Sequence, residues 1–150
     1  MFYKIKKVKA LPNLKLQVLF IGGAVKIYDV KPLLKKWEPF KIFKKHPALF
    51  KKVKVDAGGY GIIWNEDLDL SCNELWHNGI AENPRNIMAT ELLCNLVAAR
   101  QQKGLSQRDI AEKTGIKQPV IARIENGNSD PQLSTLIKIA SACGANIGFL

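Results

Sequence analysis

The chain has 150 residues, enough for one ordinary domain or two small ones. Its 47% hydrophobic and 24% charged residues are typical of a soluble globular protein and argue against a disordered chain, and no apolar run approaches the roughly 20 residues of a membrane span. The net charge of +10 predicts a polyanionic or acidic partner.

The opening residues and the cysteines indicate a cytoplasmic protein. The first ten residues, MFYKIKKVKA, place charges where a signal peptide needs a hydrophobic stretch. Cys72, Cys94 and Cys143 are odd in number, lie far apart and lack metal-ligand spacing. We therefore expect free cysteines that act as small core or surface side chains in a reducing compartment, with no metal and no cofactor.

The first half of the chain predicts an antiparallel sheet. Residues 2–10 are expected to form a strand whose alternation is blurred by lysines. In residues 14–20 the apolar side chains recur with period two, which is typical of a half-buried strand: Leu14, Leu16, Val18 and Phe20. Gly22 and Gly23 separate this strand from the next apolar run, so residues 14–30 are expected to form a β-hairpin.

The remainder of the first half predicts short helical turns and a second hairpin. Three prolines limit residues 31–52 to short turns, and three phenylalanines there are expected to cover the sheet: Phe40, Phe43 and Phe50. Residues 53–64 repeat the hairpin pattern around a Gly-Gly pair, with Val53, Val55, Ile62 and Trp64 as core candidates. A short helix over residues 70–76 is expected to close a small α+β domain that spans residues 1–78.

The basic residues differ in type between the two halves. Residues 1–78 hold 15 lysines, no arginine and 7 acidic residues, whereas all the arginines lie in residues 79–150. Lysine is a strongly hydrated point charge, while the planar guanidinium of arginine pairs with base edges and carboxylates. This shift predicts two domains with different roles, joined by a linker or helix start over residues 77–86.

From residue 84 the apolar period becomes helical, so residues 84–150 predict an all-α domain. A helix over residues 87–102 is expected to end at Gly104. Ser106 and Asp109 form a capping-box variant that begins a helix of about two turns, and Gly115 is expected to end it with a positive φ.

Two further helices follow in this half. The first covers residues 118–126, where the first turn tolerates Pro119. The second lies within residues 131–144 and is expected to turn five apolar side chains inward: Leu133, Leu136, Ile137, Ile139 and Ala140.

Two helices of about eight residues joined by a glycine-containing turn make a helix-turn-helix. The sequence GLSQRDIAEKTGIKQPVIARIENG followed by DPQLSTLIKIASACG resembles the repressor-type helix-turn-helix family of phage repressors and bacterial xenobiotic-response-element regulators, over roughly residues 88–144. The resemblance implies a sequence-specific transcriptional regulator, a repressor or autoregulator rather than an enzyme, that binds a double-stranded DNA operator as a homodimer.

The resemblance also assigns roles to individual residues. It places helix 118–126 in the major groove and implies seven DNA-contacting residues: Gln107, Lys117, Gln118, Pro119, Arg123, Asn126 and Asn128. Within this set the expected contacts are a phosphate for Gln107, an adenine for Gln118, a thymine methyl group for Pro119, and a guanine or phosphate for Arg123. The two asparagines are expected to face the DNA backbone.

Lys117 is a poor N-cap residue, which favours a contact role for it. The sequence offers no structural task that would explain Gln107, Lys117, Gln118 and Arg123. By resemblance to the family, Arg100 and Glu125 are expected to form a structural ion pair. His46 and His77 stand alone, without the partners of a catalytic site, and Glu66, Asp67 and Asp69 are interpreted as a solvated hairpin edge or turn.

The first half resembles, less specifically, a small bacterial domain of unknown function. The residues that carry this likeness are YKIKKVKALPNLKLQVLFIGGAVKIYDVKPLL and FKKVKVDAGGYGIIWNEDLDLSCNELW. Such domains occur alone, fused to helix-turn-helix domains or encoded beside small toxin-like proteins, so sensing, dimerisation and partner binding all stay open. Its lysines could add DNA affinity, bind an acidic toxin or serve solubility alone.

Two questions follow from these resemblances. The alternative function is that of an antitoxin, in which the first domain binds a toxin and the second regulates the operon. The family usually adds a fifth helix, but here only ANIGFL follows Gly144. This difference shifts the expected dimer contact to the first domain or to a C-terminal strand pair.

Overall fold

The computed structural model describes residues 1–83 and 85–148, without the side chain of Arg85, and divides into two compact units. The N-terminal unit spans residues 2–90, and the C-terminal unit begins at Glu91. The domain limits expected from the sequence, 1–78 and 84–150, stay a prediction. Pro84, Phe149 and Leu150 lie outside the described residues. Each unit is built as the sequence predicts, with an α+β N-terminal part and a helical C-terminal part.

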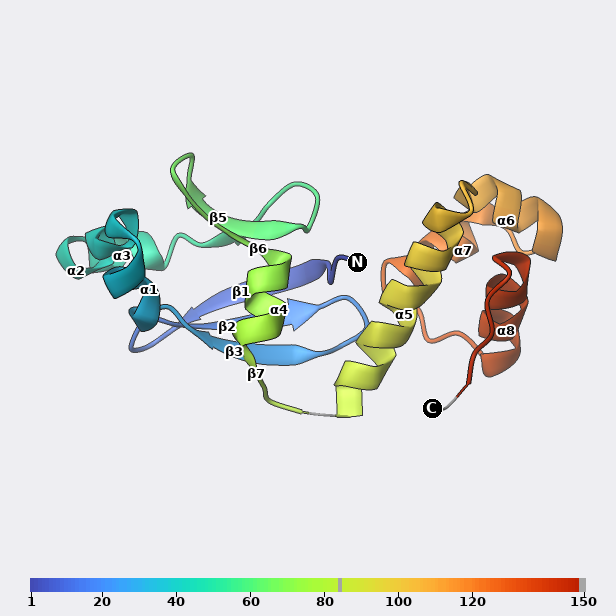
Figure 1. Ribbon diagram of the computed structural model, residues 1–150, viewed down its shortest axis with the longest axis horizontal. Coiled ribbons are helices and arrows are strands. Elements are labelled where there is room, and N and C mark those ends of the chain that lie inside the picture. The colour runs from blue at the N-terminus through green and yellow to red at the C-terminus, as the bar shows by residue number, and fades with distance from the viewer. Residues whose placement is uncertain (84, 149–150) are drawn as a thin grey trace. The chain divides into compact units, whose positions relative to one another are not determined.

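The first sheet of the N-terminal unit has the antiparallel order β1-β2-β3-β7 (Figure 1). Its strands are β1 (Ile5–Leu11), β2 (Lys15–Phe20), β3 (Val25–Asp29) and β7 (Ile80–Ala81). The period-two prediction for β2 is confirmed, because Leu16, Val18 and Phe20 are fully buried. Leu14 lies instead in the turn before β2, where it and Asn13 have φ values of 55° and 60°.

The sequence interpretation missed two strands, β6 (Leu68–Ser71), where a turn and a helix start were expected, and β7. Residues 77–86 were expected to be a linker or a helix start, but Ile80 and Ala81 pair with Ile27 and Lys26 of β3. Two residues are too short for any period to appear in the sequence. They form a strand because the unpaired edge of β3 supplies hydrogen-bonding partners for their backbone.

Helix α4 (Cys72–Asn78) lies against the first sheet (Figure 1). Ser71 caps it by accepting a hydrogen bond from the backbone N–H of Glu74 at 3.2 Å. Its buried Trp76 stacks on Tyr3, with ring centroids 4.0 Å apart, and meets the edge of Phe20 at 5.0 Å. The short helix predicted over residues 70–76 thus begins two residues later, because Leu70 and Ser71 belong to strand β6, and it closes the core of this unit.

A second antiparallel sheet has the order β4-β5-β6 and packs with the short helices. Its strands are β4 (Lys54–Val55), β5 (Gly61–Asn65) and β6 (Leu68–Ser71), and the helices are α1 (Lys31–Lys36), α2 (Ile42–Lys45), α3 (Pro47–Phe50) and the 3-10 helix η1 (Glu38–Lys41). Phe40, Phe43 and Phe50 surround Trp64 of β5 at centroid distances of 5.0–5.9 Å. The phenylalanines of the predicted short turns thus form one aromatic cluster with Trp64.

The start of helix α5 (Arg85–Gln102) belongs to the N-terminal unit and contacts the β2–β3 turn. Thr90 is fully buried, and its hydroxyl accepts a hydrogen bond from the backbone N–H of Ala24 at 3.0 Å. A Cβ atom on Gly22 would lie 2.5 Å from the Cα of Thr90, and Gly22 has a φ of 97°. Only glycine fits this close approach.

The C-terminal unit contains α6 (Gln107–Thr114), α7 (Gln118–Glu125) and α8 (Leu133–Ala142), with the later part of α5 (Figure 1). Its core is built from side chains of all four helices, namely Leu96, Ile110, Ile121, Ile124, Leu136, Ile139 and Ala140. Gly104 and Gly115 have φ values of 67° and 74°, so the expected left-handed helix ends are confirmed.

The inward face predicted for the last helix is partly wrong. Leu136, Ile139 and Ala140 are buried, but Leu133 and Ile137 of α8 are 62% and 47% exposed. The helix is apolar on more than one side, so the period alone could not select the side that packs against α6. Cys72, Cys94 and Cys143 are buried and form no disulfide within the described residues. No helix of the described residues is long and apolar enough to span a bilayer.

Candidate nucleic-acid interface

The turn between α6 and α7 is fixed by backbone geometry and by one threonine. Gly115 adopts the left-handed conformation, and its N–H donates to the carbonyl of Ala111 at 2.9 Å. The Thr114 hydroxyl donates to the carbonyl of Ile110 at 2.7 Å and accepts from the N–H of Ile116 at 3.2 Å. With Ile110 and Ile121 fully buried, the two helices are held at a defined angle.

The N-terminus of α6 carries the capping box that the sequence predicts. Ser106 accepts a hydrogen bond from the N–H of Asp109 at 3.1 Å, and the Asp109 carboxylate accepts from the Ser106 N–H at 2.6 Å. The hydrogen bond that the Ser106 hydroxyl donates to this carboxylate lowers the pKa of Asp109, and the backbone bond lowers it further. The charged carboxylate also favours the positive end of the helix dipole.

Arg100 and Glu125 form a two-pronged ion pair inside the C-terminal unit. Nε and Nη2 of Arg100 donate to the two Glu125 oxygens at 2.6 and 2.8 Å, while Nη1 donates to the carbonyl of Leu105 at 2.8 Å. The side chains are only 12% and 5% exposed. The hydrogen bonds to Glu125 raise the pKa of Arg100 and so favour its charged guanidinium.

A chain of hydrogen bonds extends from this pair to the surface. Gln107 Nε2 donates to Glu125 Oε2 at 2.8 Å, and Gln118 Nε2 donates to Gln107 Oε1 at 2.9 Å. The expectation that Gln107 and Gln118 lack a structural task is therefore wrong. Both residues have a structural role. Gln107 is the first residue of α6 and Gln118 the first residue of α7, and their hydrogen bonds connect the two helix starts to the buried carboxylate of Glu125.

Gln118 keeps hydrogen-bonding capacity after this contact. A glutamine amide has one acceptor oxygen and two donor hydrogens, and the bond to Gln107 uses one hydrogen. Oε1 and the other hydrogen remain on an exposed side chain. This pair of groups is the complement of the N6 and N7 edge of adenine.

The other predicted contact residues are exposed on α7 or beside it. Lys117 occupies the N-cap position of α7 without a side-chain hydrogen bond, as its poor capping ability predicts, and Pro119 stands in the first turn. Arg123, Asn126 and Asn128 are exposed toward the other end of α7, where Gly127 has a φ of 62°. The structure therefore brings Gln107, Lys117 and Gln118 together and leaves Arg123 and the two asparagines separate from them.

The Arg100–Glu125 pair agrees with the expectation from the family resemblance, but its extension through Gln107 to Gln118 has no signature in the sequence. These residues are separated by 7 to 25 positions and follow no common period. Within residues 1–83 and 85–148, no three His, Cys, Asp or Glu side chains lie close enough together to hold a metal ion.

Comparisons with known proteins match both units. The family described as helix-turn-helix matches residues 96–150, and a family of proteins of unknown function (DUF2442) matches residues 5–81. An uncharacterised HTH-type transcriptional regulator of Haemophilus influenzae is 36% identical over 90 residues, which are 60% of this chain and 86% of the relative.

Two further proteins are similar to this chain, one over a shorter segment and one at lower identity. The antitoxin HigA1 of Mycobacterium tuberculosis is 39% identical over 59 residues, which are 39% of this chain and 40% of the antitoxin. A solved structure from Nitrosomonas europaea is 18% identical, with a TM-score of 0.46 over 95% of this chain and 85% of that one, and so distant a likeness says nothing about function. From the motif geometry and the family matches, the chain belongs to the DNA-binding helix-turn-helix transcriptional regulators, and its residues 5–81 belong to the DUF2442 family.

Proposed function

We propose that this regulator acts as a repressor or autoregulator by placing α7 in the major groove of its operator. The observation that carries the proposal is the hydrogen-bonded chain from Arg100 through Glu125 and Gln107 to Gln118. This chain fixes the Gln118 amide before DNA arrives, so binding costs little side-chain entropy. A preorganised amide at the first residue of the helix is suited to pair with one adenine.

The neighbouring residues divide into groups that position the protein and groups that select bases. Gln107 accepts a hydrogen bond from the Gln118 amide, and Lys117 precedes Gln118 in the chain; both would supply polar or charged contacts to phosphates. Pro119 offers an apolar surface to a thymine methyl group, and Arg123 supplies a guanidinium one turn further along. The asparagines at 126 and 128 would contact the backbone where the chain leaves the groove.

The regulator acts as a homodimer in this proposal. A recognition helix of 8 residues contacts few base pairs, and two copies on a palindrome multiply the specificity. The two half-sites would be spaced by about one helical turn, roughly 34 Å, or by multiples of it.

The test uses operator DNA selected from a random library and a Gln118→Ala/Arg123→Ala double variant. We expect this variant to lose operator-specific binding, by roughly 100-fold or more, because each bidentate base contact contributes about 1–3 kcal/mol of discrimination. The control variant Gln102→Ala/Lys138→Ala removes one amide and one cation from exposed sites on α5 and α8. Equal operator binding by the double variant and by the wild type would refute the placement of α7.

A second function, that of an antitoxin, is supported by the relative named HigA1. In this proposal the N-terminal unit binds a small toxin encoded beside it and the C-terminal unit regulates the shared operon. The test is co-expression with the product of the neighbouring gene. Rescue of growth and a stable complex held by residues 1–78 are expected, and growth arrest that the chain cannot relieve would refute the proposal.

A further inference from the structure

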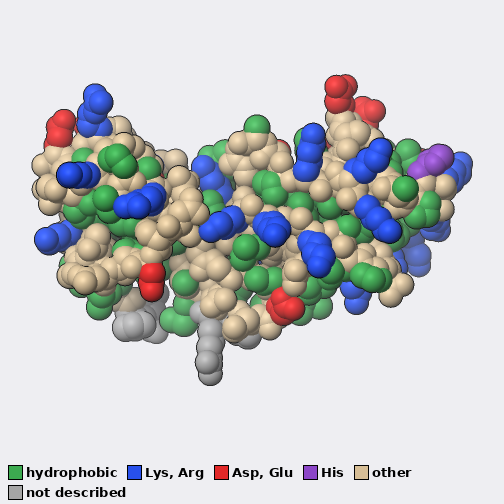
Figure 2. All heavy atoms as spheres, turned by 180° about the vertical axis from the view of Figure 1, so that it is seen from behind, with side chains coloured by type: hydrophobic (Ala, Val, Ile, Leu, Met, Phe, Trp, Pro, Cys, Tyr) green, Lys and Arg blue, Asp and Glu red, His purple; other side chains and the backbone are tan. Residues whose placement is uncertain are grey.

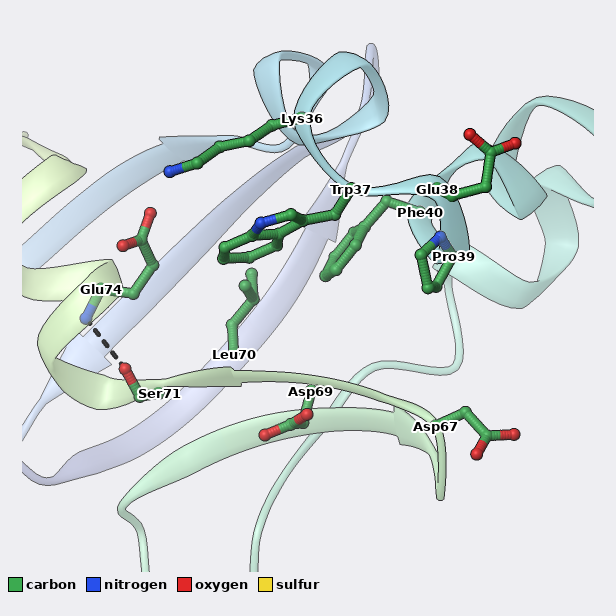
Figure 3. Close-up of a pocket in the computed structure, with 10 residues that line it drawn as sticks. All are labelled: Lys36, Trp37, Glu38, Pro39, Phe40, Asp67, Asp69, Leu70, Ser71 and Glu74. Carbon is green, nitrogen blue, oxygen red and sulfur yellow. Dashed lines mark hydrogen bonds between the residues drawn. The ribbon is translucent and has the colours of Figure 1, made fainter.

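The first sheet of the N-terminal unit has one covered and one open face. Helix α4 lies against the face that carries Leu16, Val18 and Phe20 (Figure 1). The residues that alternate with these along the strands are turned to the other face. Figure 2 views the molecule from the side opposite α4, where lysines lie beside hydrophobic side chains. On the covered side, Leu70 of β6 and Phe40 of η1 belong to the core (Figure 3). The open face is therefore the one available to another molecule.

The strand register arranges the open face in three rows that run across the sheet. Residues that pair directly across neighbouring strands share a face. The first row is Lys7, Leu19, Val25 and Glu82, the second is Lys9, Gln17, Ile27 and Ile80, and the third is Leu11, Lys15 and Asp29. Glu82 belongs to the first row because its N–H donates to the Val25 carbonyl at 2.9 Å, and its carboxylate accepts a hydrogen bond from Gln17 at 3.1 Å. Cations thus lie on β1 and β2, and carboxylates on β3 and just after β7.

The hydrophobic side chains of the open face pack against neither core. Within the described residues, both core clusters exclude Leu11, Leu19, Val25, Ile27 and Ile80. Ile80 is 77% exposed, more than any other large hydrophobic side chain in the described part of the chain. Leu19 pairs with Val25, and Ile27 with Ile80, so these four form one contiguous patch. A solvated sheet face normally carries polar side chains, and a contiguous exposed patch marks a protein contact.

The charges of the open face are only partly compensated within the chain. Across residues 1–83 and 85–148, the side chains of Lys7, Lys9 and Lys15 have no ion pair. Asp29 lies 3.6 Å from the ammonium group of Lys31, and these side chains are 42% and 52% exposed. An exposed pair of this kind contributes little. The lysines and carboxylates of the face are therefore able to pair with groups of another molecule.

We propose that two copies of this chain pack their open faces together about a two-fold axis that runs along the strands, between β2 and β3. Such an axis exchanges the two ends of each row. Lys7 then meets Glu82 of the partner subunit in the first row. In the third row Lys15 meets Asp29 of the partner subunit. The face is self-complementary, as an isologous interface requires. The inference rests on the homodimer part of the proposed function and names its surface.

The hydrophobic residues lie at the centre of the same arrangement. Leu19 and Val25 flank the axis, so Leu19 meets Val25 of the partner subunit. Ile80 lies at the edge, where the aliphatic stem of Lys9 of the partner subunit would cover it and leave the ammonium group at the rim. A hydrophobic centre with a charged rim is the usual anatomy of a protein interface.

Other axes bring unfavourable groups together. An axis on β2 places Lys15 against its own copy, and an axis on β3 does the same for Asp29. An axis perpendicular to the strands places Lys15 against Leu19. Two sheets packed face to face cross at about 30°, and strands lie about 4.8 Å apart, so the edge strands shift by roughly 4 Å. This shift is within the reach of a lysine side chain.

The test is sedimentation equilibrium of the full chain, which measures the dissociation constant of a dimer. The wild type is expected to dimerise. Lys7→Glu and Glu82→Lys should each weaken the dimer by about 10-fold or more. An exposed charge pair contributes roughly 1.5- to 5-fold, each reversal replaces attraction by repulsion, and the symmetry counts the pair twice. The double variant Lys7→Glu/Glu82→Lys restores the pair with opposite polarity, and its constant should return to within about 3-fold of the wild type.

Two further variants separate this face from general effects of charge. Lys44→Glu reverses an exposed lysine on α2, outside the face, and should change the constant by less than about twofold. Ile80→Ser removes the most exposed hydrophobic side chain and should weaken the dimer by about 10-fold or more. Circular dichroism verifies that each variant is folded.

Three outcomes would overturn the proposal. These are a monomeric wild type, an unchanged constant in both single reversals, and a double variant that does not recover. A monomeric wild type would also refute the homodimer and leave the face to an acidic protein or to DNA phosphates. A dimer that survives the reversals would refute this interface alone. The two failures are therefore distinguishable, and the placement of α7 is tested separately by the Gln118→Ala/Arg123→Ala variant.

Discussion

The most constrained residues of the C-terminal unit are Arg100 and Glu125. Their charges are nearly removed from water, and the ion pair compensates this cost only because both Glu125 oxygens and three guanidinium nitrogens have partners. Gln107 uses a further lone pair of Glu125. The buried pair therefore links the stability of the fold to the positions of the Gln107 and Gln118 amides at the proposed DNA-binding surface.

Removing one partner should therefore be costly. Arg100→Ala leaves the Glu125 carboxylate buried without its cation, and we expect it to lower the free energy of unfolding by about 3 kcal/mol. Urea unfolding followed by circular dichroism measures this loss. Arg108→Ala, which removes an exposed arginine from α6, is the control and should change stability by less than about 0.5 kcal/mol. A loss below 1 kcal/mol in Arg100→Ala would contradict the role of the pair.

At the scale of elements, the start of α7 is weakly capped. Its N-cap residue is Lys117, which makes no side-chain hydrogen bond to the free amides of the first turn. Serine, threonine, aspartate or asparagine at this position stabilises a helix. Lysine at this position is consistent with a phosphate contact that contributes more to DNA binding than the missing cap costs in stability.

This interpretation predicts opposite effects of one substitution. Lys117→Ser should stabilise the fold by about 0.5–1 kcal/mol through a new cap. It should also weaken operator binding and lower the slope of log K against log salt by about 0.9, the value for one phosphate contact. Thermal unfolding and DNA titrations over a range of salt concentrations give the two readouts.

Helix α8 supplies a matched control for this experiment. Its N-cap residue, Gln132, also makes no capping hydrogen bond. Gln132→Ser should stabilise the fold by a similar amount without changing the salt slope. If Lys117→Ser left the salt slope unchanged, Lys117 would not contact a phosphate.

At the scale of the whole molecule, each unit has a hydrophobic core of its own. The N-terminal core is centred on buried aromatic and aliphatic side chains that include Phe20, Phe43 and Leu75, and the C-terminal core on Ile110, Ile121 and Ile139. Units with separate cores open with separate free energies. We therefore expect two unfolding transitions in scanning calorimetry.

Two substitutions should identify these transitions. Gly22→Ala places a Cβ atom against the backbone of Thr90 at a positive φ, and it should lower the midpoint of one transition by at least about 5 °C. Arg100→Ala should lower the other by a similar amount. If either variant shifted both transitions equally, the chain would unfold as one cooperative unit.

Much of the fold could be predicted because it depends on neighbours in the chain. The β2–β3 hairpin, the short helices between prolines and the helix ends at glycines are all set by residues within a few positions of one another. The predicted burial of Trp64 and of the three phenylalanines is confirmed, but the packing of the phenylalanines around Trp64 could not be read from the sequence. Leu133 and Ile137 show the limit of periodicity, which gives the apolar sides of a helix and not the side that meets its neighbours.

Only part of the candidate DNA site could be predicted from the sequence. The motif spacing predicts which residues face outward on α7, and Lys117, Gln118, Pro119 and Arg123 are exposed. The hydrogen bonds that orient Gln118 join residues 11 and 18 positions apart on different helices, so no local pattern encodes them. The interpretation of Glu66, Asp67 and Asp69 as a solvated hairpin edge or turn is confirmed, since all three are exposed in the β5–β6 turn or on β6.

The sequence by itself determined the two-part architecture, the helix-turn-helix motif and the capping box of Ser106 and Asp109. These features follow from hydrophobic period, turn residues and short-range hydrogen bonds, all of which act between residues close in the chain. The tertiary structure alone decided the pairing of β7 with β3 and the extension of the Arg100–Glu125 pair through Gln107 to Gln118. Each of these depends on side chains or backbone that folding brings together from distant positions, where neither period nor spacing carries information.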